Sequence, residues 1–202
     1  MASEIWWAGL IVDNVVDVLK GMKNAIEVWK HTADGKLKTR VEGAGGEKGM
    51  RQEVCDGFNE EAFVIGNIER AMYASLAVSI NSCVENYLKH TCRRLGITVP
   101  PKAGVPDIWG LLAPDDDFPF EPQKSEGYES ADKARVCCNL FKHNEGKKDK
   151  SFVRKYDGVI DEDIEYEGED WPTIIEDVRK LLRSLALIVE KRDPPPGEDL
   201  DL

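Results

Sequence analysis

Three polar residues in the second half of the chain have the types and the spacing of a site that handles phosphate. Arg135, Asn139 and His143 follow one another at intervals of four in the segment RVCCNLFKH. In a helix, residues four apart lie on one face in successive turns. Imidazole transfers protons near neutral pH, guanidinium holds phosphate through several donors, and an amide can orient either group. A histidine at a helix end before a glycine is also an ordinary structural feature, and spacing alone favours that interpretation.

Basic residues follow this segment directly, in a chain that is acidic overall. The chain holds 27 Lys and Arg against 38 Asp and Glu, so its formal net charge is −11. Such a chain binds a polyanion only through a local basic patch. The patch predicted here, as a nucleic-acid contact, consists of Lys142, Asn144, Lys147 and Lys148.

The order of the predicted helices and the segment NLFKHNEG resemble the HEPN superfamily, nearest to its HEPN-like and RiboL-PSP-type groups from prokaryotic defence and toxin–antitoxin systems. The resemblance covers most of the chain. It implies a four-helix bundle that dimerises through its motif helices and cleaves RNA without a metal. It further implies that His143 is the motif histidine, which acts in acid–base chemistry, and that Asn139 is the polar residue that follows the motif arginine.

The chain departs from the family pattern at the motif arginine, because Cys138 stands directly before Asn139. The nearest upstream arginine is Arg135, which lies on the His143 face about 12 Å away along a helix axis. Two functions therefore remain open. One is an endoribonuclease in which His143 is the acid/base, Arg135 contacts the phosphate and Asn139 orients. The other is a non-catalytic dimerisation or protein-interaction module. The first, or a relative that has lost catalysis, is tied to RNA processing or defence, and the second neither binds nor cuts RNA. We expect a homodimer, with RNA or a cognate protein as partner.

Apolar residues at helical spacing predict four helices, over residues 5–31, 60–95, 130–143 and 169–192. The second, at 1.5 Å per residue, would be roughly 50 Å long, so it either kinks or forms the spine of a dimer. Glycines and charged residues over 34–57 predict a long loop or a weak hairpin between the first two helices.

Two further segments read as irregular structure. Proline-rich residues 97–128 predict a long loop, in which DIWGLL makes one turn, and which is either functional or pinned by its few apolar residues. Residues 147–170 are consistent with a small β-hairpin around Asp157 and Gly158. Pro172 suits the first turn of the last helix, and Thr173 with Glu176 fits a capping box.

The fold class expected is all-α: a four-helix-bundle-like HEPN domain over 1–192 with a disordered, acidic, proline-rich tail over 193–202. His31 and His90 are expected to be exposed cations near helix ends. The five cysteines and three histidines contain no CxxC or HxxxH pair, so no metal and no cofactor is predicted. No secretory signal or membrane-spanning run is visible, and a cytoplasmic protein without membrane contact is expected.

Overall fold

The structure is a computed structural model that describes residues 4–43, 48–112, 120–165 and 169–192. Over these residues the chain is built from helices, which confirms the all-α prediction. In chain order the elements are α1 (Glu4–Gly43), α2 (Lys48–Arg94), α3 (Val105–Leu111), the 3-10 turn η1 (Pro122–Lys124), α4 (Tyr128–His143), α5 (Lys150–Tyr156) and α6 (Trp171–Arg192). No helix of the described chain has the length and the apolar run that crossing a membrane requires.

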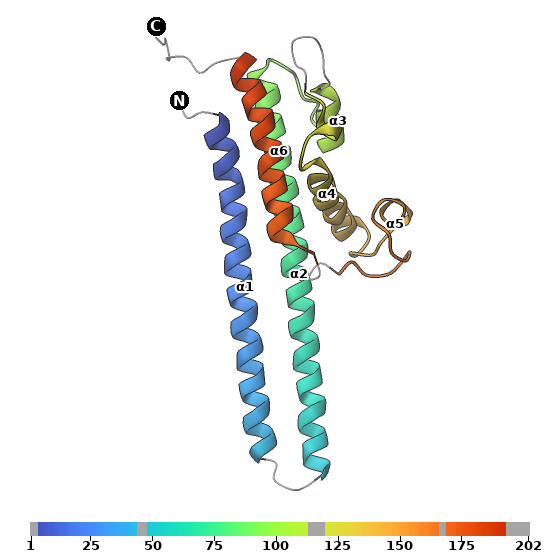
Figure 1. Cartoon of the computed structure of the whole chain (residues 1–202). Coiled ribbons are helices and arrows are strands. Elements are labelled where there is room, and N and C mark those ends of the chain that lie inside the picture. The colour runs from blue at the N-terminus through green and yellow to red at the C-terminus, as the bar shows by residue number, and fades with distance from the viewer. Residues whose placement is uncertain (1–3, 44–47, 113–119, 166–168, 193–202) are drawn as a thin grey trace.

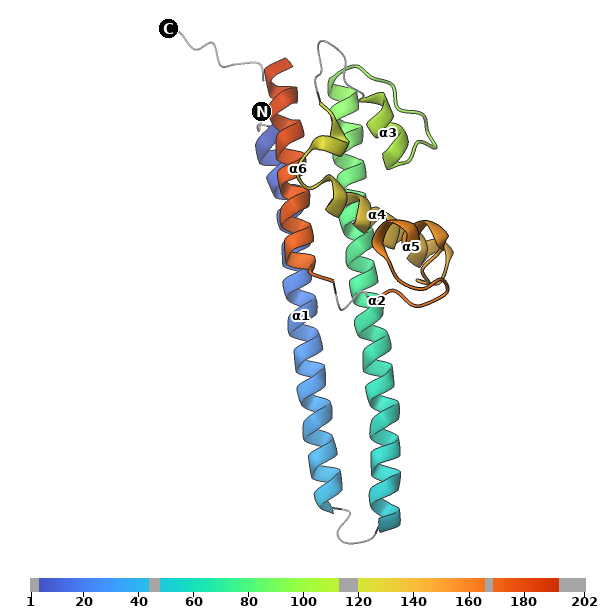
Figure 2. The same cartoon turned by 45° about the vertical axis from the view of Figure 1, so that its right-hand side comes forward.

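Helices α1 and α2 form a long antiparallel pair that extends well beyond the other helices (Figures 1 and 2). At 1.5 Å per residue, their 40 and 47 residues are about 60 and 70 Å long. Helix α6 begins beside the middle of the pair, where Trp171 stacks on Tyr73 of α2, and runs toward the end where α1 begins. The part of the pair that α6 leaves uncovered, residues 27–43 and 48–70, is called the stalk below.

The stalk corrects the predicted loop over 34–57. Asp34 and Gly35 lie within α1, and α2 already begins at Lys48, so only residues 44–47 of that segment lie outside the described chain. The turn chemistry of this segment is overridden by packing: Ala33 is buried, and α1 contacts α2 through the stalk. A glycine in a helix costs only about 1 kcal/mol relative to alanine, which such packing offsets.

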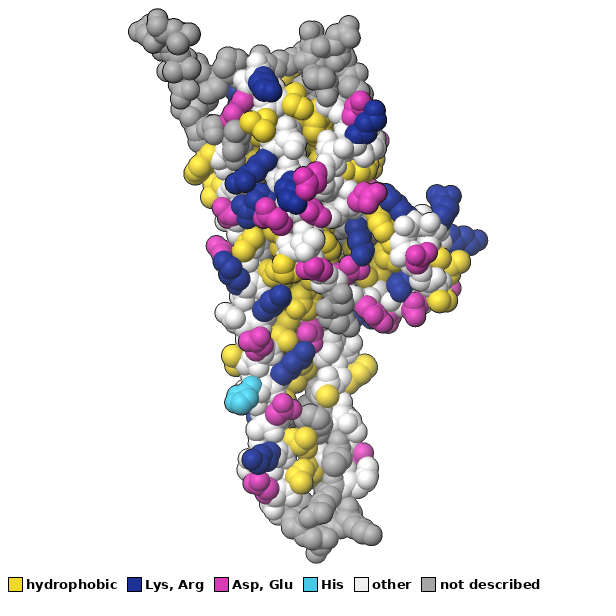
Figure 3. Space-filling view, in the orientation of Figure 1, with side chains coloured by type: hydrophobic (Ala, Val, Ile, Leu, Met, Phe, Trp, Pro, Cys, Tyr) yellow, Lys and Arg dark blue, Asp and Glu magenta, His cyan; other side chains and the backbone are white. Residues whose placement is uncertain are grey.

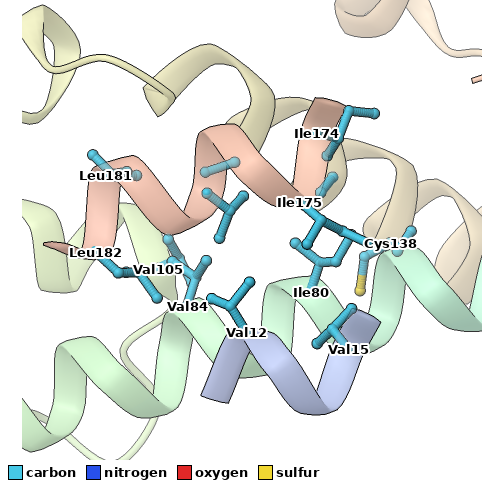
Figure 4. Packing of buried hydrophobic residues seen from close by; sticks show 14 of the residues in the cluster. Val12, Val15, Ile80, Val84, Val105, Cys138, Ile174, Ile175, Leu181 and Leu182 are labelled. Atoms are coloured by element: carbon cyan, nitrogen blue, oxygen red, sulfur yellow. The ribbon is translucent and has the colours of Figure 1, made fainter. Parts of the chain in front are cut away.

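The hydrophobic core lies where α1, α2, α4 and α6 meet. Figure 4 shows Val12 and Val15 of α1 beside Val84 and Ile80 of α2, with side chains of α6 on the other side. Stripes of apolar residues at helical spacing supply this core, as the sequence pattern predicts. Its large, fully buried side chains include Leu76, Ile80, Tyr87, Leu88, Ile108, Trp171, Leu181, Leu182 and Leu185.

The proline-rich segment is partly helical, with α3 forming around DIWGL and η1 following it. The aromatic ring of Trp109 is buried against Phe120 and Tyr128, with ring centroids 5.8 and 6.3 Å apart. The segment is therefore held in place by apolar residues. This is one of the two alternatives that the sequence predicts for it. Residues 113–119 lie outside the described chain.

The β-hairpin predicted around Asp157 and Gly158 is wrong for the segment SFVRKY, which lies in helix α5. The Asp149 side chain caps α5 by accepting a 2.8 Å hydrogen bond from the backbone N–H of Phe152, whose own ring is buried. Burial of that ring favours the helix over an exposed strand. The β-structure of the described chain in this region is one antiparallel bridge between Lys147 and Asp163.

Helix α6 occupies the predicted range, but its cap differs from the prediction. Asp170, not Thr173, accepts the capping hydrogen bonds, from the backbone N–H and the hydroxyl of Thr173 at 3.3 and 2.7 Å. These bonds lower the pKa of the Asp170 carboxyl. The predicted tail, residues 193–202, lies outside the described chain.

Candidate nucleic-acid interface

Helix α4 presents Arg135, Asn139 and His143 on one face, and local sequence fixes where it ends. The backbone N–H groups of Asn144 and Gly146 both donate to the carbonyl of Leu140, at 2.8 and 3.0 Å. Gly146 has a φ of +76°, a conformation that glycine adopts without a steric penalty. This is the helix stop that the sequence predicts, and it leaves His143 in the last turn of α4.

The three residues of this face differ in their surroundings. Asn139 and His143 are exposed, and no hydrogen bond or ion pair of the described chain involves either side chain. Arg135 is largely buried and is held by Asp132, one turn earlier, whose carboxylate accepts from its Nε and Nη2 atoms at 2.9 and 2.6 Å. The guanidinium is therefore fixed in position, whereas the imidazole is not.

Asp132 is the centre of a hydrogen-bonded network between α4 and α5. Besides Arg135, its carboxylate accepts from the ammonium of Lys155 at 2.6 Å and from the hydroxyl of Tyr156 at 2.9 Å. Burial alone would raise the pKa of Asp132, but these donors outweigh it, and the pKa lies below its ordinary value. Burial and the Asp132 charge raise the pKa of Tyr156, so its hydroxyl stays protonated and donates.

A cleft of about 360 Å³ opens between α4 and α5 beside this network. Arg135, Arg154 and Lys155 contribute cations to its lining, Ser151 contributes a hydroxyl, and Asp132 is its one carboxylate. The stretch from residue 132 to 156 contains eight Lys and Arg and only three Asp and Glu, against the net charge of −11 for the chain. In Figure 3, Lys and Arg side chains project from the lobe that carries α5. The lining of the cleft thus has the charge and the donors that an anion requires.

Of the four residues predicted to contact RNA, two have exposed side chains and two have side chains that bond to other residues of the chain. Lys142 and Lys147 are exposed. Asn144 donates to the carbonyl of Lys147 at 2.8 Å, and the ammonium of Lys148 pairs with Glu162 at 2.7 Å. Asn144 and Lys148 therefore hold the loop after α4 in shape. Sequence reasoning singled out neither Arg154 nor Lys155, although the charge run that continues through KKDKSFVRK could have indicated them.

Cys138, at the position where the motif arginine would stand, is completely buried. Figure 4 shows its side chain near Ile80 and Val15, within the core. The residue before Asn139 therefore faces the interior, and the exposed face of α4 begins one residue later.

A second polar cluster, which sequence reasoning missed, joins the start of α1 to the end of α2. The Glu4 carboxylate is almost fully buried and accepts from Arg94 at 2.5 Å, His90 at 3.0 Å and Tyr87 at 3.3 Å. The sequence predicts His90 as an exposed cation; its side chain is half-exposed and is paired with Glu4. Burial would raise the pKa of Glu4, but the hydrogen bonds and charges of His90 and Arg94 outweigh it and lower that pKa. Tyr87, His90 and Arg94 share a helical face in the sequence, but nothing local indicates a partner some 90 residues away.

We expect Asp132→Asn to lower the free energy of unfolding by about 2 kcal/mol, because a buried carboxylate with several charged donors loses its charge. Urea unfolding at pH 7 measures the loss, and Glu129→Gln, an exposed change on the same helix, should stay within about 0.5 kcal/mol of wild type. Equal stabilities for the two variants would contradict the structural role of the network.

Over the described part of the chain, no three His, Cys, Asp or Glu side chains are grouped so that they could hold a metal ion. The arrangement that the structure does offer is an anion cleft at Arg135 with an exposed imidazole on the same helical face. Comparisons of the chain with protein-family models, with curated proteins and with solved structures found no match.

Proposed function

We propose that this protein is a HEPN-like RNA-binding protein that works in RNA processing or defence, and that RNA phosphates bind in the cleft between α4 and α5. The observation that carries the proposal is the concentration of cations in that cleft, on a chain whose overall charge repels polyanions. Arg135 is already held in place by Asp132, so binding a phosphate there orders one fewer side chain. The exposed Lys142 and Lys147 extend the positive surface toward the end of α4.

The finer form of the proposal is metal-independent cleavage of the bound RNA. Arg135 and His143 lie about 12 Å apart along the axis of α4, at 1.5 Å per residue. A strand that follows this face would have one phosphate at Arg135 and another group of the backbone near His143. There the imidazole would move a proton at the 2′-hydroxyl or at the leaving oxygen, and Asn139, between them, would orient the strand.

A second candidate function is a non-catalytic module in which α4 forms a homodimer or docks a cognate protein. Two observations favour it over catalysis: Cys138 is buried where the motif arginine would stand, and the described chain provides no hydrogen-bonded partner that would orient His143. If this candidate function is right, RNA is not cleaved, and the cleft serves at most as a binding site.

Binding is tested with a labelled single-stranded RNA and the double variant Lys142→Glu/Arg154→Glu. Both side chains are exposed and have no bonded partner within the described residues, so the fold should be unaffected. We expect RNA affinity to fall at least about tenfold at 0.1 M salt, with a shallower dependence of affinity on salt, because phosphate contacts are lost. The matched control is Lys102→Glu/Lys191→Glu, which changes the net charge equally at exposed positions elsewhere. Equal losses in both variants would mean that net charge, not the cleft, governs binding.

Cleavage is tested on the same RNA in EDTA, with His143→Ala beside the wild type. Cleavage that disappears in the variant while RNA affinity is kept would support the nuclease. RNA that is bound by both proteins and cut by neither would leave the binding proposal standing and refute the catalytic one. No binding at all would refute both and direct attention to the protein-interaction module.

A further inference from the structure

The stalk exposes large apolar side chains on both of its helices. Trp29 is 42% exposed and Val64 is 54% exposed, although each side chain lies beside the other helix of the stalk. In Figure 3, hydrophobic side chains are visible between the two helices below the bundle. Two packed helices can bury only the seam between them, so these faces remain open to solvent. Among the side chains that the structure describes, the large exposed apolar ones of the stalk are Val28, Trp29, Phe63, Val64 and Ile68.

One of these faces is hollowed into a groove of about 590 Å³ along the stalk. Trp29 and Val64 line the end nearer the bundle, and Lys36, Arg40 and Gly57 line the end nearer the tip. The groove thus has bulky apolar side chains at one end and cations with a glycine at the other. Its ends differ in size and in charge.

Three glycines of the stalk have no close neighbour among the residues that the structure describes. A Cβ atom added at Gly35, Gly57 or Gly66 would meet no heavy atom within 4 Å. Glycine is one of the poorest residues in a helix interior, and its use in place of alanine is explained where another backbone approaches closely. Of the three, Gly57 lines the groove, and the open space beside it can admit the backbone of a helical occupant that is not part of the same chain.

We propose that this occupant is a second copy of the chain, whose stalk packs antiparallel in the groove about a two-fold axis to form a four-helix bundle. In this arrangement Trp29 of each copy faces the space beside Gly57 of the other. A two-fold interface must be self-complementary, and here the bulky end of one groove meets the small end of its partner.

The charges of the stalk are complementary in the same arrangement. Its tip, residues 35–43 and 48–58, contains five Lys and Arg against three Asp and Glu. Its base, residues 27–34 and 59–70, contains two Lys and Arg against five Asp and Glu. An antiparallel partner places each positive tip over a negative base, whereas a parallel partner would bring like charges together.

The area available matches what a specific dimer needs. The stalk is about 25 Å long, and its two helices together are about 20 Å wide, so one face offers about 500 Å². Two copies would bury about 1,000 Å² in total, the lower bound of a specific interface. The groove shares no lining residue with the α4–α5 cleft, and an interface there differs from dimerisation through α4.

The test is sedimentation velocity of the full chain over a range of concentrations, for the wild type and for Trp29→Glu/Val64→Glu. We expect a concentration-dependent dimer for the wild type and at least tenfold weaker association for the variant, because two carboxylates would be buried in the groove. The control is His31→Glu, an exposed change two residues from Trp29 and thus on the far side of α1, which should leave the dimer intact. Circular dichroism checks that helix content is unchanged.

Gly57→Leu provides a second variant that does not depend on the stability of the stalk. Leucine favours the helix, and an added Cβ atom meets no heavy atom within 4 Å at this position in a single chain, so the monomer should gain thermal stability while the dimer weakens at least tenfold. A wild-type monomer at all concentrations would overturn the proposal, as would a dimer that survives both groove variants. The second of these results would place the interface elsewhere, for example on α4. RNA binding measured in parallel should be unchanged, which separates a failure of this proposal from a failure of the proposed RNA site.

Discussion

Glu4→Gln is expected to lower the free energy of unfolding by about 3 kcal/mol at pH 7, because it removes the negative charge from a buried ion pair with Arg94. The same change weakens the hydrogen bonds from His90 and Tyr87. Denaturation by urea, followed by circular dichroism, measures the loss. Glu27→Gln, an exposed change on the same helix, is the control and should alter the stability by less than about 0.5 kcal/mol.

The pH dependence of this difference follows from the lowered pKa of Glu4. A carboxyl whose pKa is lower in the folded than in the unfolded state stabilises the fold above the ordinary pKa of 4.5. That contribution is lost as the pH falls through the folded-state pKa. The stability gap between wild type and Glu4→Gln should therefore be complete at neutral pH and shrink in strong acid. A gap that grows on acidification would contradict the ion pair.

Gly127→Ala is expected to cost about 4 kcal/mol or more, a loss large enough to unfold a protein of marginal stability. Gly127 precedes α4 with a φ of +85°, which strains any other residue. A Cβ atom there would lie 1.9 Å from the backbone carbonyl oxygen of Asp177 in α6. Because this neighbour is backbone, α4 and α6 would have to separate, and the bond from Ser130 to Asp177 that joins them at 2.7 Å would break.

The matched control is Gly9→Ala, in α1, where an added Cβ meets nothing within 4 Å. This change should raise stability by about 0.5–1 kcal/mol, since alanine is the better helix former. Both variants are compared by thermal and urea unfolding, and RNA binding of Gly127→Ala should fall only as the protein unfolds. Full stability of Gly127→Ala would contradict the close approach of α4 to α6.

The helices of the bundle could be predicted because each buries a continuous apolar stripe, and the end of α4 because Asn144 and Gly146 supply local stop signals. The part of the stalk between residues 32 and 59 could not be predicted. Asp34 and Gly35 carry turn chemistry, yet they lie within α1, directly after the buried Ala33. Likewise SFVRKY has β-branched and aromatic residues, but its conformation is decided by the cap at Asp149 and by burial of Phe152.

The candidate site also has one part that the sequence predicts and one part that it does not. The shared face of Arg135 and His143 follows from helical spacing, and so does the reach of Asp132, three residues before Arg135. The contribution of α5 does not follow from helical spacing. Lys155 and Tyr156 contact Asp132 only because the loop after α4 folds back. Local order in the sequence thus specifies one wall of the cleft, and tertiary packing specifies the other.

The place of α6 in the bundle also has a consequence for how the protein is made. The apolar stripe of α1, including Val12, Val15 and Leu19, is covered by a helix that begins only at Trp171. At a synthesis rate of 5–20 residues per second, about 10–30 s pass between the synthesis of that stripe and the synthesis of α6, which covers it. During this interval α2 is the main part of the nascent chain available to shield it. The α1–α2 pair is therefore complete before α6 is synthesised, and the stripe of α1 is exposed to other binding partners for that whole interval.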